Sequence, residues 1–184
     1  MQIKNTPNTY GLVAVLLHWL VAITVIGLFA LGWWMTGLDY YSSWYQQAPF
    51  IHKSIGLLLW LAVLMRALWR GVSVSPDDEP NTPRWQSRIA HSVHRLLYGM
   101  LLVILLSGYL ISTADGRGIE VFGWFTVPAV ISDLPDQEDI AGAVHWYIAL
   151  AMMGLVLVHT LAALKHHFID KDRTLMKMLG CLRK

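Results

Sequence analysis

The stretch IAGAVHWYIALAMMGLVLVHTLAAL, residues 140–164, contains no acidic side chain, no lysine and no arginine. Crossing about 30 Å of hydrocarbon takes about 20 residues of helix, so this stretch is long enough to span a lipid bilayer. It also holds two histidines, His145 and His159, among apolar neighbours. Ionisable side chains inside a membrane span are costly, so both histidines are candidates for a function.

Three further segments have the length and the apolar character of membrane spans: residues 11–35, 49–69 and 89–113. Of the 184 residues, 55% are apolar and only 14% are charged, whereas a typical soluble domain has about 25% charged residues. Prolines and glycines interrupt the pattern in segments 73–83 and 114–139, which are expected to be loops. The sequence therefore predicts an all-α fold. We expect a single domain over residues 1–184, an integral membrane four-helix bundle with a tail at 165–184.

The first span is expected to be retained rather than cleaved, because it is longer than the apolar region of a usual signal peptide. The distribution of basic residues then predicts the orientation of the chain across the membrane. Twelve of them lie on the N-terminal arm, the second loop and the C-terminal tail, or on the helix ends beside these, and two lie elsewhere. The twelve are Lys4, Arg66, Arg70, Arg84, Arg88, Arg95, Lys165, Lys171, Arg173, Lys177, Arg183 and Lys184, and the two are Lys53 and Arg117. Because positive residues stay on the cytoplasmic side, both termini are expected to be cytoplasmic.

The third loop faces outward on this topology, and it is acidic. Its carboxylates are Asp115, Glu120, Asp133, Asp136, Glu138 and Asp139, against the single basic residue Arg117. A surface of this charge is expected to repel small anions. No nucleic-acid partner is expected.

The apolar spans contain histidines but no acidic residues. Neutral imidazole suits iron ligation in an apolar site. His145 and His159 are fourteen residues apart, which leaves them within about 40° of the same helix face and roughly 21 Å apart along the axis. His52 lies one turn into the second span, at the depth expected for His145. His18 lies about two turns into the first span, at the depth expected for His159. Two pairs at two depths predict two b-type haems, each held by two histidines.

Other residues admit more than one interpretation. Gly56 and Gly154 make room either for a flat macrocycle or for close contact between helices. His91 and His94, at the inner start of the third span, either face lipid headgroups or a polar substrate, or ligate a metal. His166 and His167 either cap the end of the fourth helix or flank a quinone site, in which His94 or His166 would exchange the proton. Arg66 or Arg95 either holds haem propionates or only sets the topology.

Cys181 is the only cysteine, so neither an intrachain disulfide nor a thiolate metal cage is possible, and it is expected to be a free cytosolic thiol. Transporters of protons or ions usually carry carboxylates or broken helices inside the membrane, and these spans have neither. A zinc transporter would be expected to add acidic or thiolate ligands. A membrane-anchor cytochrome subunit that serves a separate redox protein remains an alternative.

Five motifs resemble the bacterial cytochromes b561, which are small four-helix dihaem membrane proteins. They are LLHWL around His18, HKSIGLLL from His52, HSVHRLLYGMLL from His91, GRGIEVFGWFTVP from Gly116, and HWYIALAMMGLVLVHTLAALKHH from His145. The resemblance covers nearly the whole chain and implies a multi-pass protein of the bacterial inner membrane. It implies that His18 and His159 bind the inner haem, and that His52 and His145 bind the outer haem.

The resemblance also implies an activity, electron exchange between ubiquinone in the membrane and a donor or acceptor at the periplasmic face. One branch of the family is a superoxide oxidase, in which an electron passes from superoxide through both haems to ubiquinone. A similar reaction here would use Arg117 to attract the anion, against six loop carboxylates that repel it. The alternative is a cytochrome b subunit that exchanges electrons with a periplasmic redox protein.

Overall fold

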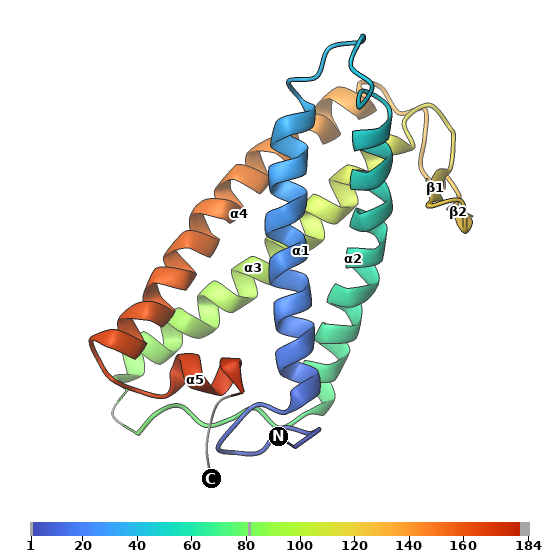
Figure 1. Cartoon of the computed structure of the whole chain (residues 1–184). Helices are drawn as coiled ribbons and strands as arrows, with labels where there is room; N and C mark the ends of the chain where they lie inside the picture. The colour runs from blue at the N-terminus through green and yellow to red at the C-terminus, as the bar shows by residue number, and fades with distance from the viewer. Residues whose placement is uncertain (1, 81, 181–184) are drawn as a thin grey trace. The chain divides into compact units, whose positions relative to one another are not determined.

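The computed structural model describes residues 2–80 and 82–180 and is almost entirely helical (Figure 1). Four long helices account for most of it: α1 (Leu12–Met35), α2 (Gln47–Val72), α3 (Arg84–Ser112) and α4 (Gln137–Phe168). Each is long and apolar enough to cross a membrane. A two-stranded sheet, β1 (Ile119–Val121) and β2 (Phe125–Val127), and a short helix α5 (Thr174–Leu179) complete the described chain. The predicted all-α membrane fold is confirmed.

The helices run further than the apolar segments that reveal them. The third helix begins at Arg84 rather than at residue 89, and α4 runs from Gln137 to Phe168 rather than over 140–164. Apolar character ends where the hydrocarbon ends, whereas backbone hydrogen bonding continues through polar residues. The carbonyl of Pro83 accepts hydrogen bonds from Gln86 and Ser87 and so starts α3. Cys181, Arg183 and Lys184 lie outside the described residues.

The chain divides into two compact units, and every long helix contributes one part to each. Unit 1 comprises residues 1–21, 62–98 and 153–184, and unit 2 comprises residues 22–61 and 99–152. Unit 1 therefore contains both termini and the loop between α2 and α3. Unit 2 contains the loop between α1 and α2 and the loop between α3 and α4.

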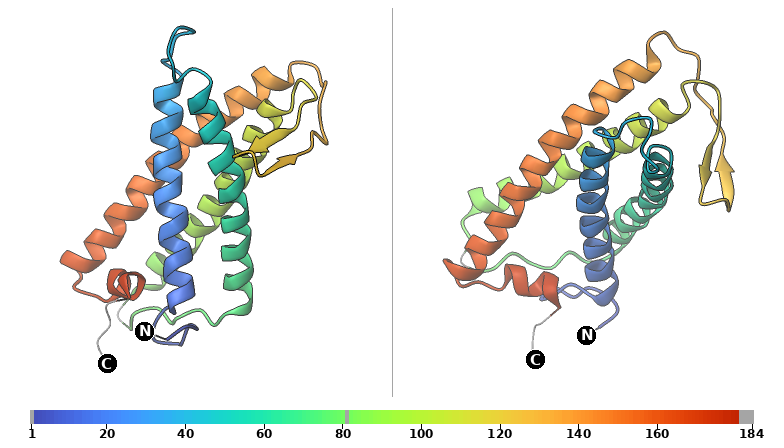
Figure 2. Two further views of the ribbon diagram at one scale, coloured as in Figure 1. Left: turned by 45° about the vertical axis from the view of Figure 1, so that its right-hand side comes forward. Right: turned by 45° about the horizontal axis from the view of Figure 1, so that its top comes forward.

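Hydrogen bonds in unit 1 join three segments that are distant in the sequence (Figure 2). Asn5 of the N-terminal arm donates to the carbonyl of Val74 at 2.9 Å. Lys177 of α5 donates to the carbonyl of Asp77 at 2.9 Å and forms an ion pair with Glu79. These contacts fix the loop between α2 and α3 to both terminal segments.

The β1–β2 hairpin of unit 2 was missed by the sequence prediction, which expected only a loop there. Its turn has positive φ at both Phe122 (49°) and Gly123 (74°), a conformation that glycine adopts without strain. The fully buried Ser54 of α2 holds the hairpin in place. Its hydroxyl accepts a hydrogen bond from the backbone N–H of Phe122 at 3.2 Å and donates to the carbonyl of Glu120 at 3.4 Å. Ser54 therefore ties the HKSIGLLL motif to the GRGIEVFGWFTVP motif.

Few apolar side chains of the long helices are buried in a protein core; the others are half-buried or exposed. In the most apolar window of α4, only 6% of the residues are buried. Exposed leucine, isoleucine and valine side chains along such helices are compatible with lipid contact.

Candidate functional site

His52 of α2 and His145 of α4 face each other in unit 2. Their ring centroids are 6.2 Å apart, and the ring planes are inclined by 68°. Two imidazoles that bind one metal ion from opposite sides, with N–metal bonds of about 2 Å, have their centroids about 6 Å apart. The sequence pairing of these two histidines therefore has a geometry that suits a shared iron.

The ring of His145 is held by α3. Its Nδ1 atom lies 2.9 Å from the carbonyl oxygen of Ile104 and 3.2 Å from the hydroxyl of the buried Ser107. Because a carbonyl only accepts, Nδ1 carries the ring proton and Nε2 keeps its lone pair. A metal-binding histidine commonly donates its second N–H in this way.

Two glycines leave space for the histidine rings. A Cβ atom on Gly32 of α1 would lie 3.2 Å from Cε1 of His52, and one on Gly108 of α3 would lie 3.1 Å from Cε1 of His145. Both distances are closer than ordinary van der Waals contact, so larger side chains would push the rings away. These glycines therefore leave room for the imidazoles where they lie.

A second observation bears on whether the residues of this site can hold a haem. Nδ1 of His52 is buried and has no hydrogen-bond partner among the described residues. An unpaired buried nitrogen is costly, so the site is compatible with a bound group that uses this imidazole. Around Gly56 no atom lies within 4 Å of the position that a Cβ would take, and the same holds for Gly154. Gly56 therefore leaves open space in unit 2, whereas Gly154 belongs to unit 1 and is not part of this site.

Unit 1 contains a second group of histidines. His94 of α3 and His159 of α4 have ring centroids 5.3 Å apart, with planes inclined by 69°. His18 of α1 lies within electrostatic range of both. The unit thus brings together the two predicted inner ligands and His94, and the direct ring contact is between His159 and His94.

Arg66 of α2 connects His18 to Tyr98 of α3. Its Nη1 atom lies 2.6 Å from Nδ1 of His18, and its Nε donates to the hydroxyl of Tyr98 at 2.8 Å. Since an arginine only donates, Nδ1 of His18 is the acceptor. Arg70 lies over the same tyrosine ring, with its Cζ atom 5.8 Å from the centroid. The guanidinium of Arg66 is therefore in direct contact with this histidine group.

The remaining histidines have other neighbours. His91 is exposed and its Nδ1 lies 2.8 Å from the carbonyl of Ser87 in its own helix. His166 interacts with the carboxylates of Asp170 and Asp172, and the ring of His167 contacts that of Phe168. Arg95 is exposed and donates to Ser92. No contact joins His94 to His166 among the residues that the structure describes, so the two predicted quinone-site histidines belong to separate groups.

Arg117, the predicted outer-face residue, is engaged by an acidic neighbour. It is 85% exposed and forms an ion pair with Asp115, which also accepts a hydrogen bond from the backbone N–H of Arg117. Hydrogen bonds from Arg117 lower the pKa of Asp115, and Asp115 raises the pKa of Arg117. The charge of Arg117 is thus largely offset by its partner.

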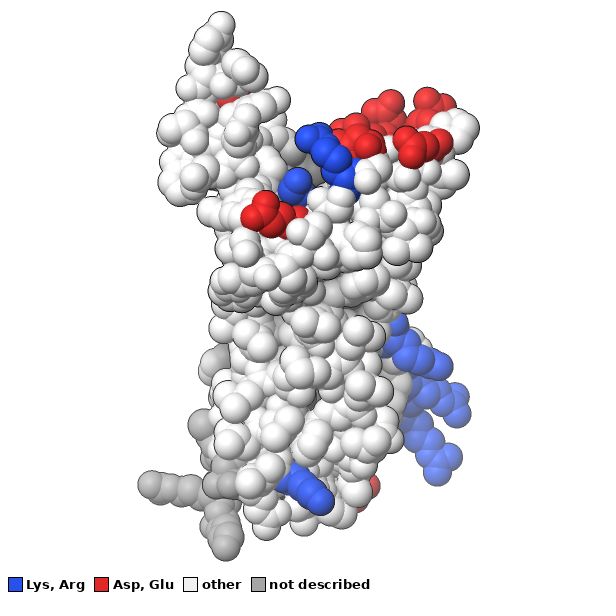
Figure 3. All heavy atoms as spheres, turned by 90° about the vertical axis from the view of Figure 1, so that its right-hand side faces the viewer, with Lys and Arg blue, Asp and Glu red and all other residues white. Residues whose placement is uncertain are grey.

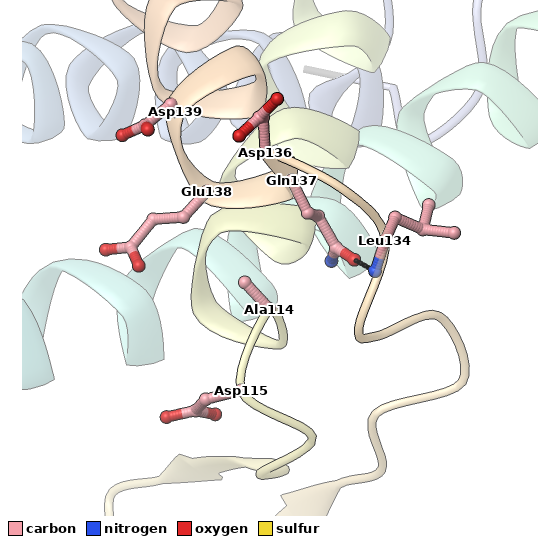
Figure 4. A pocket seen from close by; sticks show the side chains of 7 residues that line it. All are labelled: Ala114, Asp115, Leu134, Asp136, Gln137, Glu138 and Asp139. Atoms are coloured by element: carbon pink, nitrogen blue, oxygen red, sulfur yellow. Dashed lines mark hydrogen bonds between the residues drawn. The ribbon is translucent and has the colours of Figure 1, made fainter.

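Acidic side chains also line a hollow of about 270 Å³ beside this pair. Figure 4 shows Asp115, Asp136, Glu138 and Asp139 around it, with Gln137 bonded to the backbone N–H of Leu134. On the face in Figure 3, acidic side chains gather at the upper end next to a few basic ones. This part of unit 2 presents mainly negative charge.

Sequence reasoning missed Ser54, Gly32, Gly108 and the contact of Arg66 with Tyr98. Each acts through a residue that is distant in the sequence, and spacing within one helix does not reveal such partners. The motifs did contain a signal for Ser54, which stands two residues after His52 in HKSIGLLL. Gly108 likewise lies near the end of a span where helix propensity gives no reason for glycine.

The family described as prokaryotic cytochrome b561 matches residues 9–180. The chain is 50% identical to cytochrome b561 homolog 2 of Escherichia coli (strain K12), over 98% of this chain and 96% of that protein. It is 29% identical to cytochrome b561 homolog 1 of the same organism, over 94% and 97% of the two chains. A protein named probable superoxide oxidase CybB, from Yersinia pestis, is 26% identical over 92% of this chain and 95% of its own length. With four membrane-spanning helices and paired histidines in place, the chain belongs to the prokaryotic cytochrome b561 family, whose members are haem-based electron-transport proteins of the membrane.

Proposed function

We propose that this cytochrome transfers electrons across the bacterial inner membrane, between ubiquinone and a donor or acceptor at the periplasmic face. The observation that carries the proposal is the pairing of His52 with His145 at 6.2 Å, with Nδ1 of His145 bonded to Ile104. Two haems b would supply one-electron chemistry, and two histidines bound to each iron would favour electron transfer over oxygen activation.

In this proposal His52 and His145 hold the outer haem, and His18 and His159 hold the inner one. The carbonyl of Ile104 fixes the tautomer of His145, so that its Nε2 binds the metal. Arg66 lies at the inner group and is the better of the two predicted propionate partners, because Arg95 is exposed and bonded to Ser92. Because Nδ1 of His18 accepts from Arg66, its ring proton is on Nε2; moving the Arg66 guanidinium to a carboxylate would let that proton shift to Nδ1 and leave Nε2 able to bind a metal.

At the inner end a quinone needs a group that exchanges protons. His94 suits this role because it adjoins His159 without being needed for the His18–His159 pair. His166 suits it less well, because its Nδ1 is already 2.6 Å from the carboxylate of Asp172. We therefore assign proton exchange with ubiquinone to His94.

At the outer face the charge distribution favours a cationic protein over superoxide. Arg117 is neutralised by Asp115, and the neighbouring hollow is lined by carboxylates. A negative surface lowers the local concentration of anions and raises that of a basic protein. The second candidate function is accordingly electron exchange with a basic periplasmic redox protein. We place this acidic face in the periplasm, so that both termini of the chain lie in the cytoplasm.

The test is haem quantification and absorption spectroscopy of the detergent-purified protein and of single alanine variants. Two low-spin haems are expected per chain. Replacing His52 or His145 should remove one of them, replacing His18 or His159 should remove the other, and His94→Ala should retain both. If His94→Ala loses the inner haem while His18→Ala keeps it, the inner ligand assignment is wrong. A folded protein that contains no haem would contradict the whole proposal.

Quinone coupling needs its own measurement. In proteoliposomes that contain ubiquinol, the wild-type haems should be reduced through the membrane phase. His94→Ala should slow this reduction while leaving the haem spectrum unchanged, and His91→Ala is the matched control on the same helix. Equal rates in all three proteins would remove His94 from the quinone reaction.

A further inference from the structure

The C-terminal end of α4 and the segment after it carry a cluster of side chains of metal-ligand type, none of which belongs to either histidine group described above. Its members are His166, Asp170 and Asp172, whose ligand atoms all lie within 4.8 Å of one another. Nδ1 of His166 is 2.6 Å from Oδ2 of Asp172 and 3.2 Å from Oδ2 of Asp170. The cluster lines a hollow of about 490 Å³ whose wall also includes Glu79.

The backbone shapes this cluster. The N–H of Asp172 donates to the carbonyl of His166 at 3.0 Å, which closes a loop from the end of the helix. Lys171, between the two aspartates, has φ of 55°, a left-handed conformation that costs energy for a residue other than glycine. This conformation turns both carboxylates toward the same imidazole.

Hydrogen bonds favour the ionised form of Asp172, which is the form that would bind a metal ion. Its Oδ1 accepts the backbone N–H of Thr174 at 2.9 Å, which leaves Oδ2 directed at His166. Burial raises the pKa of this carboxyl, but the hydrogen bonds from Thr174 and His166 outweigh that effect and the pKa is lowered. The last carbonyls of α4 add the negative end of the helix dipole, which favours a cation here.

We propose that His166, Asp170 and Asp172 bind a divalent transition-metal ion of the zinc class, with water at the remaining positions. One imidazole nitrogen and two carboxylates favour such ions over Mg²⁺ and Ca²⁺, which prefer oxygen ligands alone. Lys165 already forms an ion pair with Asp170 at 2.7 Å, so its ammonium competes with the metal. The site is independent of the haems and of the proposed electron transfer.

The position of the site gives the ion a structural role. It would fix the segment that leads into α5, and the carbonyl of Met178 in α5 accepts the indole N–H of Trp19 at 2.9 Å. Trp19 is the neighbour of His18 in α1 and contacts its ring. Metal binding would therefore hold the C-terminal segment against the helix that carries a predicted haem ligand.

The test uses the haem-containing full chain in detergent, stripped of other metals, with Zn²⁺ titrated by calorimetry and Mg²⁺ as the comparison. One Zn²⁺ should bind per chain, with far weaker binding of Mg²⁺. His166→Ala and Asp172→Asn should each weaken Zn²⁺ binding by about tenfold or more, whereas Lys165→Met should strengthen it by about three- to tenfold. His167→Ala, which removes the adjacent imidazole, should leave the affinity unchanged.

A second readout follows the C-terminal segment itself. Zn²⁺ should slow proteolytic cleavage after residue 168 in the wild-type protein and in His167→Ala, but not in His166→Ala or Asp172→Asn. The proposal is overturned if the wild-type protein binds no Zn²⁺, or if His166→Ala and Asp172→Asn bind it as tightly as the wild type. Unchanged Zn²⁺ binding in both variants is the result expected if the cluster is only a network of ion pairs.

Discussion

The Nδ1 atom of His145 in α4 lies 2.9 Å from the carbonyl oxygen of Ile104 in α3. One turn further along α3, Gly108 leaves the space that the edge of the same ring occupies, since a Cβ there would lie 3.1 Å from Cε1. The helix thus orients the imidazole with one residue and makes room for it with another. A histidine that is held in this way reaches a metal without reorganising.

Gly108→Val should therefore displace the His145 ring and weaken binding of the outer haem by about tenfold or more. The measurement is haem content per chain together with the low-spin absorption spectrum. Gly99→Val is the matched control, because nothing lies within 4 Å of a Cβ at that position in the same helix. Equal haem content in the two variants would show that Gly108 does not seat the ring.

The hydroxyl of Ser54 should stabilise the β1–β2 hairpin. Ser54→Ala leaves the N–H of Phe122 without its acceptor, at a residue already strained by a φ of 49°. We expect local opening to become easier by about 1 kcal/mol, which corresponds to roughly fivefold faster amide exchange in residues 119–127. Hydrogen–deuterium exchange measures this directly. Ser92→Ala, which loses only an exposed contact with Arg95, should leave the hairpin amides unchanged.

Arg66 should raise the potential of the inner haem, because a nearby positive charge stabilises the reduced form. Arg66→Met removes the guanidinium beside His18 and should lower that midpoint potential by roughly 30–60 mV, with the outer haem unaffected. A redox titration followed by absorption separates the two haems. Arg95→Met, which removes an exposed arginine, should shift neither potential, and a shift of the same size in both variants would assign the effect to overall charge.

Much of the fold was accessible from the sequence, because four long apolar segments leave few alternatives in lipid. The His52–His145 pair was predicted from depth along two helices; the structure places the two ring centroids 6.2 Å apart, and their role as haem ligands stays a prediction. The hairpin at Ile119–Val121 and Phe125–Val127 was not predicted, since three-residue strands carry almost no periodic signal. The contact of His94 with His159 was also missed, because it depends on how two helices face each other, which spacing within one helix does not fix.

Asp115 and Arg117 should control how small anions reach the outer haem. Asp115→Asn leaves the guanidinium of Arg117 without its carboxylate partner, so reduction of the haems by an anionic reductant such as ascorbate should become about two- to tenfold faster at low salt. Arg117→Gln should slow the same reaction. Oriented proteoliposomes with ascorbate on the outer side provide the measurement, and reduction by neutral ubiquinol is the control that neither variant should alter.

The lowered pKa of Asp115 fixes the pH dependence of this effect. A carboxyl with a depressed pKa stays ionised until the pH falls below its usual value of about 4. The difference between wild type and Asp115→Asn should therefore stay constant from about pH 5 to pH 8 and disappear only in stronger acid. A difference that changed between these two pH values would assign the effect to a histidine instead. An effect that persisted at high salt would show that Asp115 acts through local structure rather than through the field of its charge.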